Sequence, residues 1–233
     1  MKIDPVVQRQ FSSIINNMCE FNPYFELLLS KEFFKTRGLS IVNEYPSLKS
    51  SIEKYSKYLR NIKRQNFDQK SMLVLLEEEA FSQEIGLNNN PQSFYTVHWN
   101  IKTLGNLIEK YHLKPKTVLI ETIIERLSHG SVSNIDESIP IRTEPIIAVH
   151  YPMISESPKI IIVDGNYRTV RKYLRGDKTI DVYFVPPNVH LKAMINDISL
   201  ISYKIHHNCF NIINYMIGEI SDLKDLKKMN FRF

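Results

Sequence analysis

The sequence predicts an α+β fold, in which a helical N-terminal region precedes a small mixed sheet and further helices follow. Three observations support this prediction. Apolar residues recur at spacings of three and four through the first 90 residues, strand and helix patterns alternate from 94 to 185, and helical spacing returns after Asn188. The predicted domains are therefore a helical domain over 1–90, a mixed-sheet domain over 91–187 and a helical extension over 188–233.

The composition is that of an ordinary globular protein. The chain has 233 residues, of which 43% are hydrophobic and 24% charged, enough to bury a core. No signal-peptide pattern opens it, no apolar run approaches a membrane span, and Cys19 and Cys209 have no metal or redox spacing. We therefore expect a cytoplasmic protein without membrane contact. The net charge of +5 is compatible with phosphate or nucleic-acid partners.

The N-terminal region is predicted to contain four helices. Pro23 and Ser71 are suitable residues for helix starts, and Gly86 for a helix end. The cluster NNNPQS over 88–93 predicts a turn and is the candidate domain boundary. The predicted helices cover 11–18, 23–36, 50–65 and 71–85.

The second half is predicted to alternate strands and helices around one sheet. The run KIIIV is apolar throughout, which favours a central strand. Gly130 and Gly176 are each expected to end a helix. The predicted strands are 94–101, 145–151, 159–163 and 179–185, and the predicted helices are 116–130, 169–176 and those after 188.

The segment DGNYR, from Asp164 to Arg168, links a predicted buried strand to a predicted helix. A glycine at Gly165 permits a tight turn and a close ligand approach. The free N–H groups and positive dipole end of the following helix favour an anion. Arg168 is placed to add a bidentate phosphate contact, and Arg171 follows it along the helix. The sequence therefore predicts a phosphate-binding turn, with a purely structural turn as the alternative.

Asp164 is the candidate catalytic residue of this turn. As a carboxylate beside a phosphate it could hold Mg²⁺. The alternative is that it caps the helix or fixes the turn.

The order of elements around DGNYR resembles the core of the ParB/sulfiredoxin superfamily. The stretch IIIVDGNYRTVRKYLRGDKTIDVYFV has the family's strand, Gly-x-x-Arg turn, helix ending in glycine and alternating strand, and LIETIIERLSHG and EPIIAVHY resemble its upstream elements. The resemblance covers roughly 95–186. It implies that Gly165, Asn166, Tyr167 and Arg168 bind the phosphates of a nucleoside triphosphate, CTP or ATP, with Mg²⁺.

Departures from the family pattern limit what the resemblance implies about chemistry. Asn166 stands where sulfiredoxins need a cysteine, and Asn166-Tyr167 replaces the His-His of the kinase and nuclease branches. The first hypothesis is a nucleotide-binding protein, with NTP hydrolysis or phosphate transfer as its activity, acting with DNA. The alternatives are a non-catalytic DNA- or protein-binding adaptor and a metal-dependent nuclease. A homodimer and an origin on a mobile element are expectations by analogy.

Other polar clusters are weaker candidates for sites. Lys54, Lys57, Arg60 and Arg64 form a basic stripe on a predicted helix, which favours either nucleic-acid binding or a solvated face. Glu77, Glu78 and Glu79 are adjacent, so their side chains point in different directions along a helix. His206, His207 and Cys209 do not have a standard zinc spacing. No metal site is therefore predicted from protein ligands alone.

Overall fold

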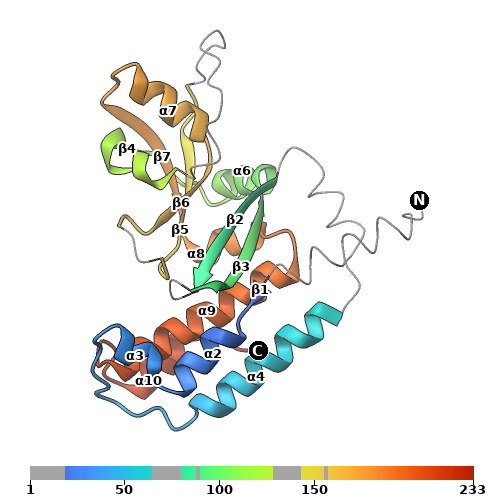
Figure 1. Cartoon of the computed structure of the whole chain (residues 1–233). Helices are drawn as coiled ribbons and strands as arrows, with labels where there is room; N and C mark the ends of the chain where they lie inside the picture. Colours follow the sequence, from blue (N-terminus) through green and yellow to red (C-terminus); the bar gives the residue numbers. More distant parts are fainter. Residues whose placement is uncertain (1–18, 65–79, 88–89, 128–142, 155–156) are drawn as a thin grey trace, which may run out of the picture. The chain divides into compact units, whose positions relative to one another are not determined.

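The computed structural model describes residues 19–64, 80–87, 90–127, 143–154 and 157–233, and it has an α+β fold (Figure 1). The described residues form two compact units. The first unit takes residues from 19–64, 82–98 and 194–233, and the second from 80–81 and 99–193. This grouping places the C-terminal helices with the N-terminal ones, whereas the sequence pattern separated them at 90 and 188.

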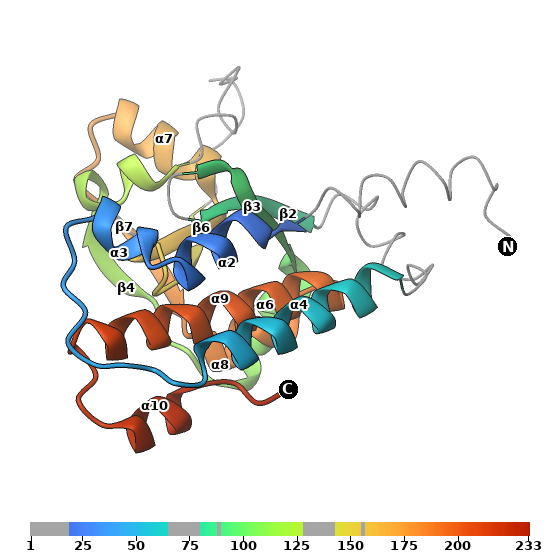
Figure 2. The same cartoon turned by 60° about the horizontal axis from the view of Figure 1, so that its bottom comes forward.

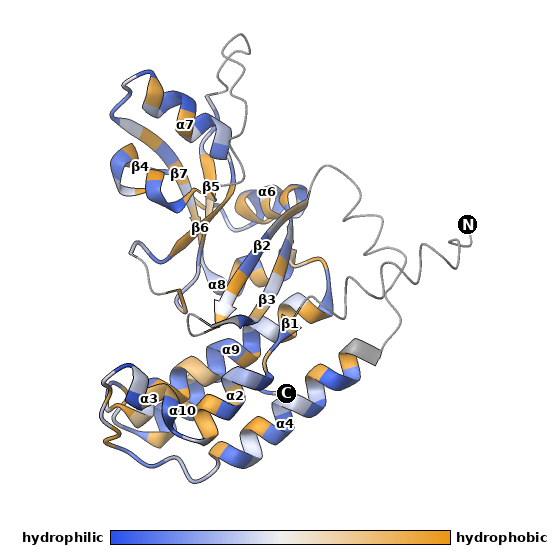
Figure 3. Ribbon diagram, in the orientation of Figure 1, coloured by the Kyte–Doolittle hydropathy of each residue, from blue (hydrophilic) through white to orange (hydrophobic). Residues whose placement is uncertain are grey.

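Helices dominate the first unit. The amphipathic helix α4 (Leu48–Arg64) confirms the helix predicted over 50–65, and the long helix α9 (Asp197–Met216) lies beside it (Figure 2). Hydrophobic and hydrophilic residues alternate along α4 in Figure 3. Its apolar side buries Ile52, Tyr55 and Leu59. The remaining helices are α2 (Asn22–Leu29), α3 (Glu32–Thr36) and α10 (Leu223–Met229).

One predicted N-terminal helix is divided into two. The helix expected over 23–36 stops at Ser30, because Lys31 has a φ of 63° and so leaves the helical conformation before α3 begins. The break lets α2 and α3 bury different aromatic residues, Phe25 from α2 and Phe33 and Phe34 from α3. The helix expected over 11–18 lies outside the described residues.

The helix expected over 71–85 is wrong in its described part. Residues Ala80–Leu87 form strand β2, which pairs with β3 (Asn90–Asn100), and β3 pairs antiparallel with β1 (Cys19–Glu20). The Ser82 hydroxyl lies 2.6 Å from Nδ1 of His98 across the strands. Pairing with β3 satisfies the backbone of this segment and outweighs its local helical preference. The expected turn over 88–93 also ends early, since Asn90 already belongs to β3.

The second unit is built on a four-stranded mixed sheet in the order β4-β7-β5-β6. Strands β4 and β7 are antiparallel, β7 and β5 parallel, and β5 and β6 antiparallel. Strand β7 confirms the strand predicted over 179–185. The four strands are β4 (Lys116–Leu119), β5 (Ile146–His150), β6 (Ile160–Asp164) and β7 (Thr179–Val185).

Strand β6 lies at an edge of the sheet among the described strands, so its predicted central position is wrong. Its residues Ile160 to Val163 are nevertheless all buried. Ile160 and Ile162 join one core cluster with Ile146 and Ala148 of β5 and with Ile120 and Ile123. The apolar run therefore indicates that both faces of the strand are buried. It does not indicate that the strand is central in the sheet.

The amphipathic helix predicted over 116–130 is also wrong. Residues 116–119 form β4, and two short 3-10 turns follow, η1 (Ile120–Thr122) and η2 (Ile124–Arg126). Thr117 and Val118 are β-branched, which suits the pairing with β7. Gly130 lies outside the described residues.

Four further helical elements belong to the second unit. Helix α6 (Ile101–Lys110) was not predicted, and its first turn is capped by Asn100, whose side chain accepts from the Thr103 N–H at 2.7 Å. Helix α7 (Asn166–Leu174) follows β6 and ends before Gly176. Helix α8 (Pro187–His190) and η3 (Leu191–Ala193) follow β7. None of the described helices is both long and apolar enough to cross a bilayer.

Candidate functional site

The turn between β6 and α7 has the backbone geometry that the sequence predicted. Gly165 occupies the N-cap position with φ 92° and ψ 17°, a left-handed conformation that favours glycine. Its carbonyl oxygen accepts from the backbone N–H of Thr169 at 2.9 Å and from the Thr169 hydroxyl at 3.0 Å. The buried Thr169 therefore fixes the first turn of α7.

The close approach of the Ile146 side chain also requires a glycine at position 165. A Cβ at this position would lie 2.4 Å from Cγ2 and 2.8 Å from Cβ of Ile146. The antiparallel pairing of β5 with β6, which places Ile147 opposite Asp164, brings the Ile146 side chain against the turn. The backbone can follow this path only without a side chain at Gly165.

Arg168 is held against this turn by two acceptors. Its Nη2 donates to Oδ2 of Asp164 at 2.6 Å, and its Nη1 donates to the Glu144 carbonyl oxygen at 2.8 Å. The Arg168 side chain is only 14% exposed, whereas the Asp164 side chain is 39% exposed. Gly165 has no side chain to cap α7, and the Asp164 carboxylate pairs with Arg168, so Asp164 fixes the turn through Arg168.

An open hollow of about 380 Å³ lies at the start of α7. Its lining is continuous in sequence and combines the carboxylate of Asp164, the N-terminal backbone of α7 and the guanidinium of Arg168. Tyr167 is 41% exposed. The structure thus brings together five of the six predicted residues of the phosphate site, Asp164 to Arg168, while Arg171 lies outside the lining.

The acceptors around Arg168 suit a phosphate ligand that carries a divalent cation. Mg²⁺ on a nucleotide takes most of its ligands from phosphates and water and needs only one or two carboxylates. Asp164 provides one in the hollow, and the exposed Glu144 carboxylate lies 3.6 Å from Nη1 of Arg168. Among the described residues no group of three or more His, Cys, Asp or Glu side chains could hold a metal ion by itself.

Two residues beside this site were not predicted from the sequence, Glu144 and Ile146. They lie about 20 residues upstream of the turn and come beside it only through the pairing of β5 with β6. No local pattern in the sequence signals that contact.

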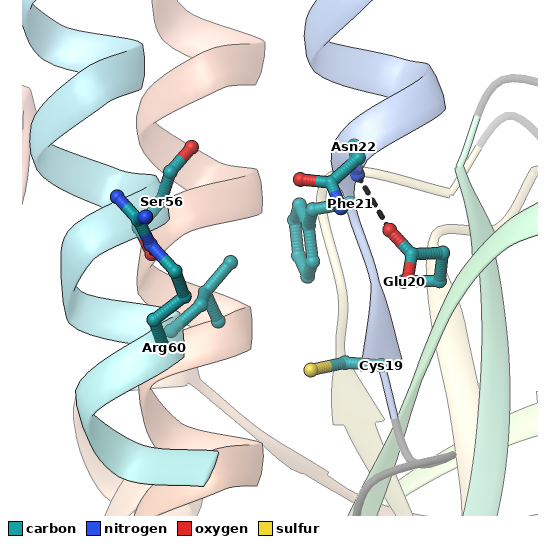
Figure 4. Close-up of a pocket in the computed structure, with 7 residues that line it drawn as sticks. Cys19, Glu20, Phe21, Asn22, Ser56 and Arg60 are labelled. Atoms are coloured by element: carbon teal, nitrogen blue, oxygen red, sulfur yellow. Dashed lines mark hydrogen bonds between the residues drawn. The ribbon is translucent and has the colours of Figure 1, made fainter. Parts of the chain in front are cut away.

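Two residues of the basic stripe of α4 line separate hollows of the first unit, Arg60 one and Lys54 another, and Lys57 lines neither. Lys54, Lys57 and Arg60 are exposed, and the Arg64 side chain lies outside the described residues. Arg60 lines a hollow of about 390 Å³ opposite the segment from Cys19 to Asn22, as Figure 4 shows. Glu20 also lines that hollow and accepts from the Asn22 N–H at 2.9 Å, whereas Nε of Arg60 donates to the Ser56 carbonyl oxygen at 3.3 Å.

The His206 and Cys209 side chains of α9 belong to the core of the first unit, and His207 is half-buried. Nδ1 of His206 lies 3.0 Å from the Tyr95 hydroxyl, and Tyr24 packs edge-on against the His206 ring. Burial lowers the pKa of His206 to about 3 and raises the pKa of the Cys209 thiol. Both groups are therefore held neutral. Glu77, Glu78 and Glu79 lie outside the described residues.

The buried histidines predict acid sensitivity of the first unit. Burial lowers the pKa of His98 to about 4 and of His206 to about 3, from an ordinary 6.5. Below pH 6.5 the unfolded chain binds protons that the folded chain excludes, so stability is lost as the pH falls toward 4. Together the two sites should lower the free energy of unfolding by about 2.7 kcal/mol per pH unit across this window. Urea unfolding between pH 7 and pH 4.5 measures the slope.

A matched pair of variants tests how much His206 contributes to that slope. His206→Gln should reduce it by about 1.4 kcal/mol per pH unit. His112→Gln, which changes an exposed histidine, should leave it unchanged. Equal slopes in all three proteins would show that protonation of His206 does not contribute to the acid sensitivity.

Comparison of the chain with family models, curated proteins and solved structures gave no match. The resemblance to the ParB/sulfiredoxin superfamily therefore stays a prediction, carried by DGNYR and the order of elements around it. The geometry of the turn is the basis for the function inferred for this chain.

Proposed function

We propose that this chain binds a nucleoside triphosphate, CTP or ATP, with its phosphates in the hollow at the start of α7. The observation that carries the proposal is the turn at Gly165. Its N-cap residue, Gly165, has no side chain to cap α7, and the guanidinium of Arg168 lines the hollow at the same N-terminus. The positive end of a helix dipole and an arginine beside it both favour a phosphate.

Asp164 makes the site depend on a cation. With Arg168 paired to Asp164 at 2.6 Å, the two charges largely cancel, and a bare phosphate would meet a carboxylate in the same hollow. Mg²⁺ bound with the nucleotide would neutralise phosphate charge and attract Asp164. Arg168 would then be free to turn toward the phosphate while keeping its bond to the Glu144 carbonyl.

Turnover would require a general base in the hollow. Asp164 is the carboxylate that lines the hollow, so it is the residue to test as a general base in NTP hydrolysis or phosphate transfer. Neither Asn166 nor Tyr167 supplies the histidine that related branches use. Loss of NTP turnover in Asp164→Asn, with nucleotide binding retained, would support a catalytic role, and unchanged turnover would remove it.

Thermal unfolding with CTP, ATP, ADP and GTP, each with and without Mg²⁺, tests binding. A nucleotide at about 100 times its dissociation constant should stabilise the fold by about 2.7 kcal/mol. We expect a rise in Tm with at least one triphosphate and Mg²⁺, which Arg168→Ala abolishes. Arg175→Ala is the matched control, because Arg175 lies just after α7 and pairs with Asp177 outside the hollow. No rise with any nucleotide at millimolar concentration would refute the proposal.

The nuclease hypothesis is tested in the same variants. Metal-dependent nicking of plasmid DNA should disappear in Asp164→Ala if the hollow is a nuclease site. Nicking that survives the substitution would place the activity elsewhere.

A further inference from the structure

The first unit contains a second hollow, of about 360 Å³, between α4, α9 and the segment after α10. Three cations meet there, Lys54 of α4, Lys227 of α10 and Arg232 shortly after α10. Ser51, Tyr55 and Asn230 add polar groups to the lining. Among the described residues no Asp or Glu side chain lines this hollow. We call it the α4–tail hollow.

The segment 230–233 is fixed in place, so Arg232 has a defined position. The buried Asn208 side chain donates to the Phe231 carbonyl at 2.8 Å and accepts from the Phe231 N–H at 2.7 Å. Phe231 packs against the His207 ring at 5.0 Å, and Phe233 packs against the Tyr58 ring at 5.1 Å. Anchoring of both neighbours leaves Arg232 exposed between them.

The three cations are not neutralised within the described part of the chain. Lys227 and Arg232 form no ion pair with described residues, and Lys54 has a long 3.4 Å contact to the Phe233 carbonyl oxygen. Even a free carboxylate at Phe233 would leave two uncompensated positive charges. Exposed cations of one sign around a concave surface attract a polyanion.

We propose that the α4–tail hollow binds the phosphodiester backbone of single-stranded nucleic acid. Its cations lie exposed on an open surface, which suits a flexible chain of phosphates better than one enclosed anion. The half-buried rings of Tyr58 and Phe233 beside the cations provide a surface on which bases can stack. Lys57 lies one turn along α4 from Lys54 and extends the positive surface. This site uses no residue of the α7 hollow.

Fluorescence anisotropy with a labelled oligothymidylate, titrated at several salt concentrations, tests the proposal. The variant Lys54→Gln/Lys227→Gln removes two cations of the hollow. Each phosphate contact to a single strand contributes about 0.7 to the slope of log K against log salt, so this slope should fall by about 1.4. The affinity at low salt should fall several-fold. An unchanged Tm would show that the variant is folded.

The matched control is Lys49→Gln/Lys224→Gln. It removes one exposed lysine from α4 and one from α10, the two helices that carry Lys54 and Lys227. Both positions lie outside the hollow. We expect it to retain most of the affinity and slope. Equal losses in both double variants would overturn the proposal, because general charge would then explain binding. Absence of oligonucleotide binding, or binding of inorganic tripolyphosphate alone through Lys54 and Lys227, would also overturn it.

Discussion

Replacing Gly165 by alanine should destabilise the protein by about 2–5 kcal/mol, the largest effect that we expect from a single substitution. The left-handed φ of 92° costs an L-residue about 1–2 kcal/mol. The new Cβ would also lie 2.4 Å from Cγ2 of Ile146, which forces movement of a buried side chain at about 1–3 kcal/mol more. Urea unfolding followed by the ellipticity at the helix and sheet bands measures the loss.

Gly176→Ala separates the two contributions. Gly176 has a similar φ of 83°, but a Cβ there would meet no atom within 4 Å. This control should therefore lose only the conformational part, about 1–2 kcal/mol. Equal losses in the two variants would mean that Ile146 moves aside without cost, and that the tight approach of β5 to the turn is not what requires glycine.

Replacing Asn208 by leucine should release the segment 230–233 and destabilise the first unit by about 2–4 kcal/mol. The side chain is buried and uses all its hydrogen-bonding groups. It donates to the Tyr55 hydroxyl at 3.3 Å and to the Phe231 carbonyl at 2.8 Å, and it accepts from the Phe231 N–H. Leucine fills similar volume but leaves these partners without Asn208. Asn208→Asp should be worse, because it places a carboxylate beside the Phe231 carbonyl oxygen.

Two measurements distinguish local release from global destabilisation. Trypsin should cleave after Lys228 faster in Asn208→Leu than in the wild type, and urea unfolding should report the change in stability. Asn214→Leu is the control on the same helix, at a half-buried position whose side chain forms no hydrogen bond with described residues of the segment 230–233. Cleavage rates and stabilities that match between the two variants would show that the Asn208 amide does not hold the segment.

The sequence predicted best the elements whose local pattern agrees with their tertiary surroundings. The apolar and basic sides of α4 and the alternation of β7 each match the buried and exposed sides in the structure. In contrast, the segment from Ala80 and the segment from Lys116 have helical spacing but form strands. Strand β3 follows β2 directly, and β7 lies far along the chain from β4; in both cases pairing with another strand outweighed the local helical spacing.

The candidate phosphate site shows the same division. The left-handed glycine and the start of a helix after it follow from the order of residues in DGNYR, and the structure has both. The ion pair that holds Arg168 back depends on the rotamers of Asp164 and Arg168 in the folded protein. The contacts of Gly165 with Ile146 and of Arg168 with Glu144 depend on the register of β5 against β6. No local pattern in the sequence predicts this ion pair or these two contacts.

The discontinuity of the first unit has a consequence for synthesis on the ribosome. Helix α4 emerges early, but its neighbour α9 begins only at Asp197, after the whole of the second unit has been translated. The second unit is nearly continuous from 99 to 193 and can complete its sheet first. Nascent chains halted before Asp197 should therefore expose the apolar side of α4, which makes that side a target for chaperones until α9 arrives.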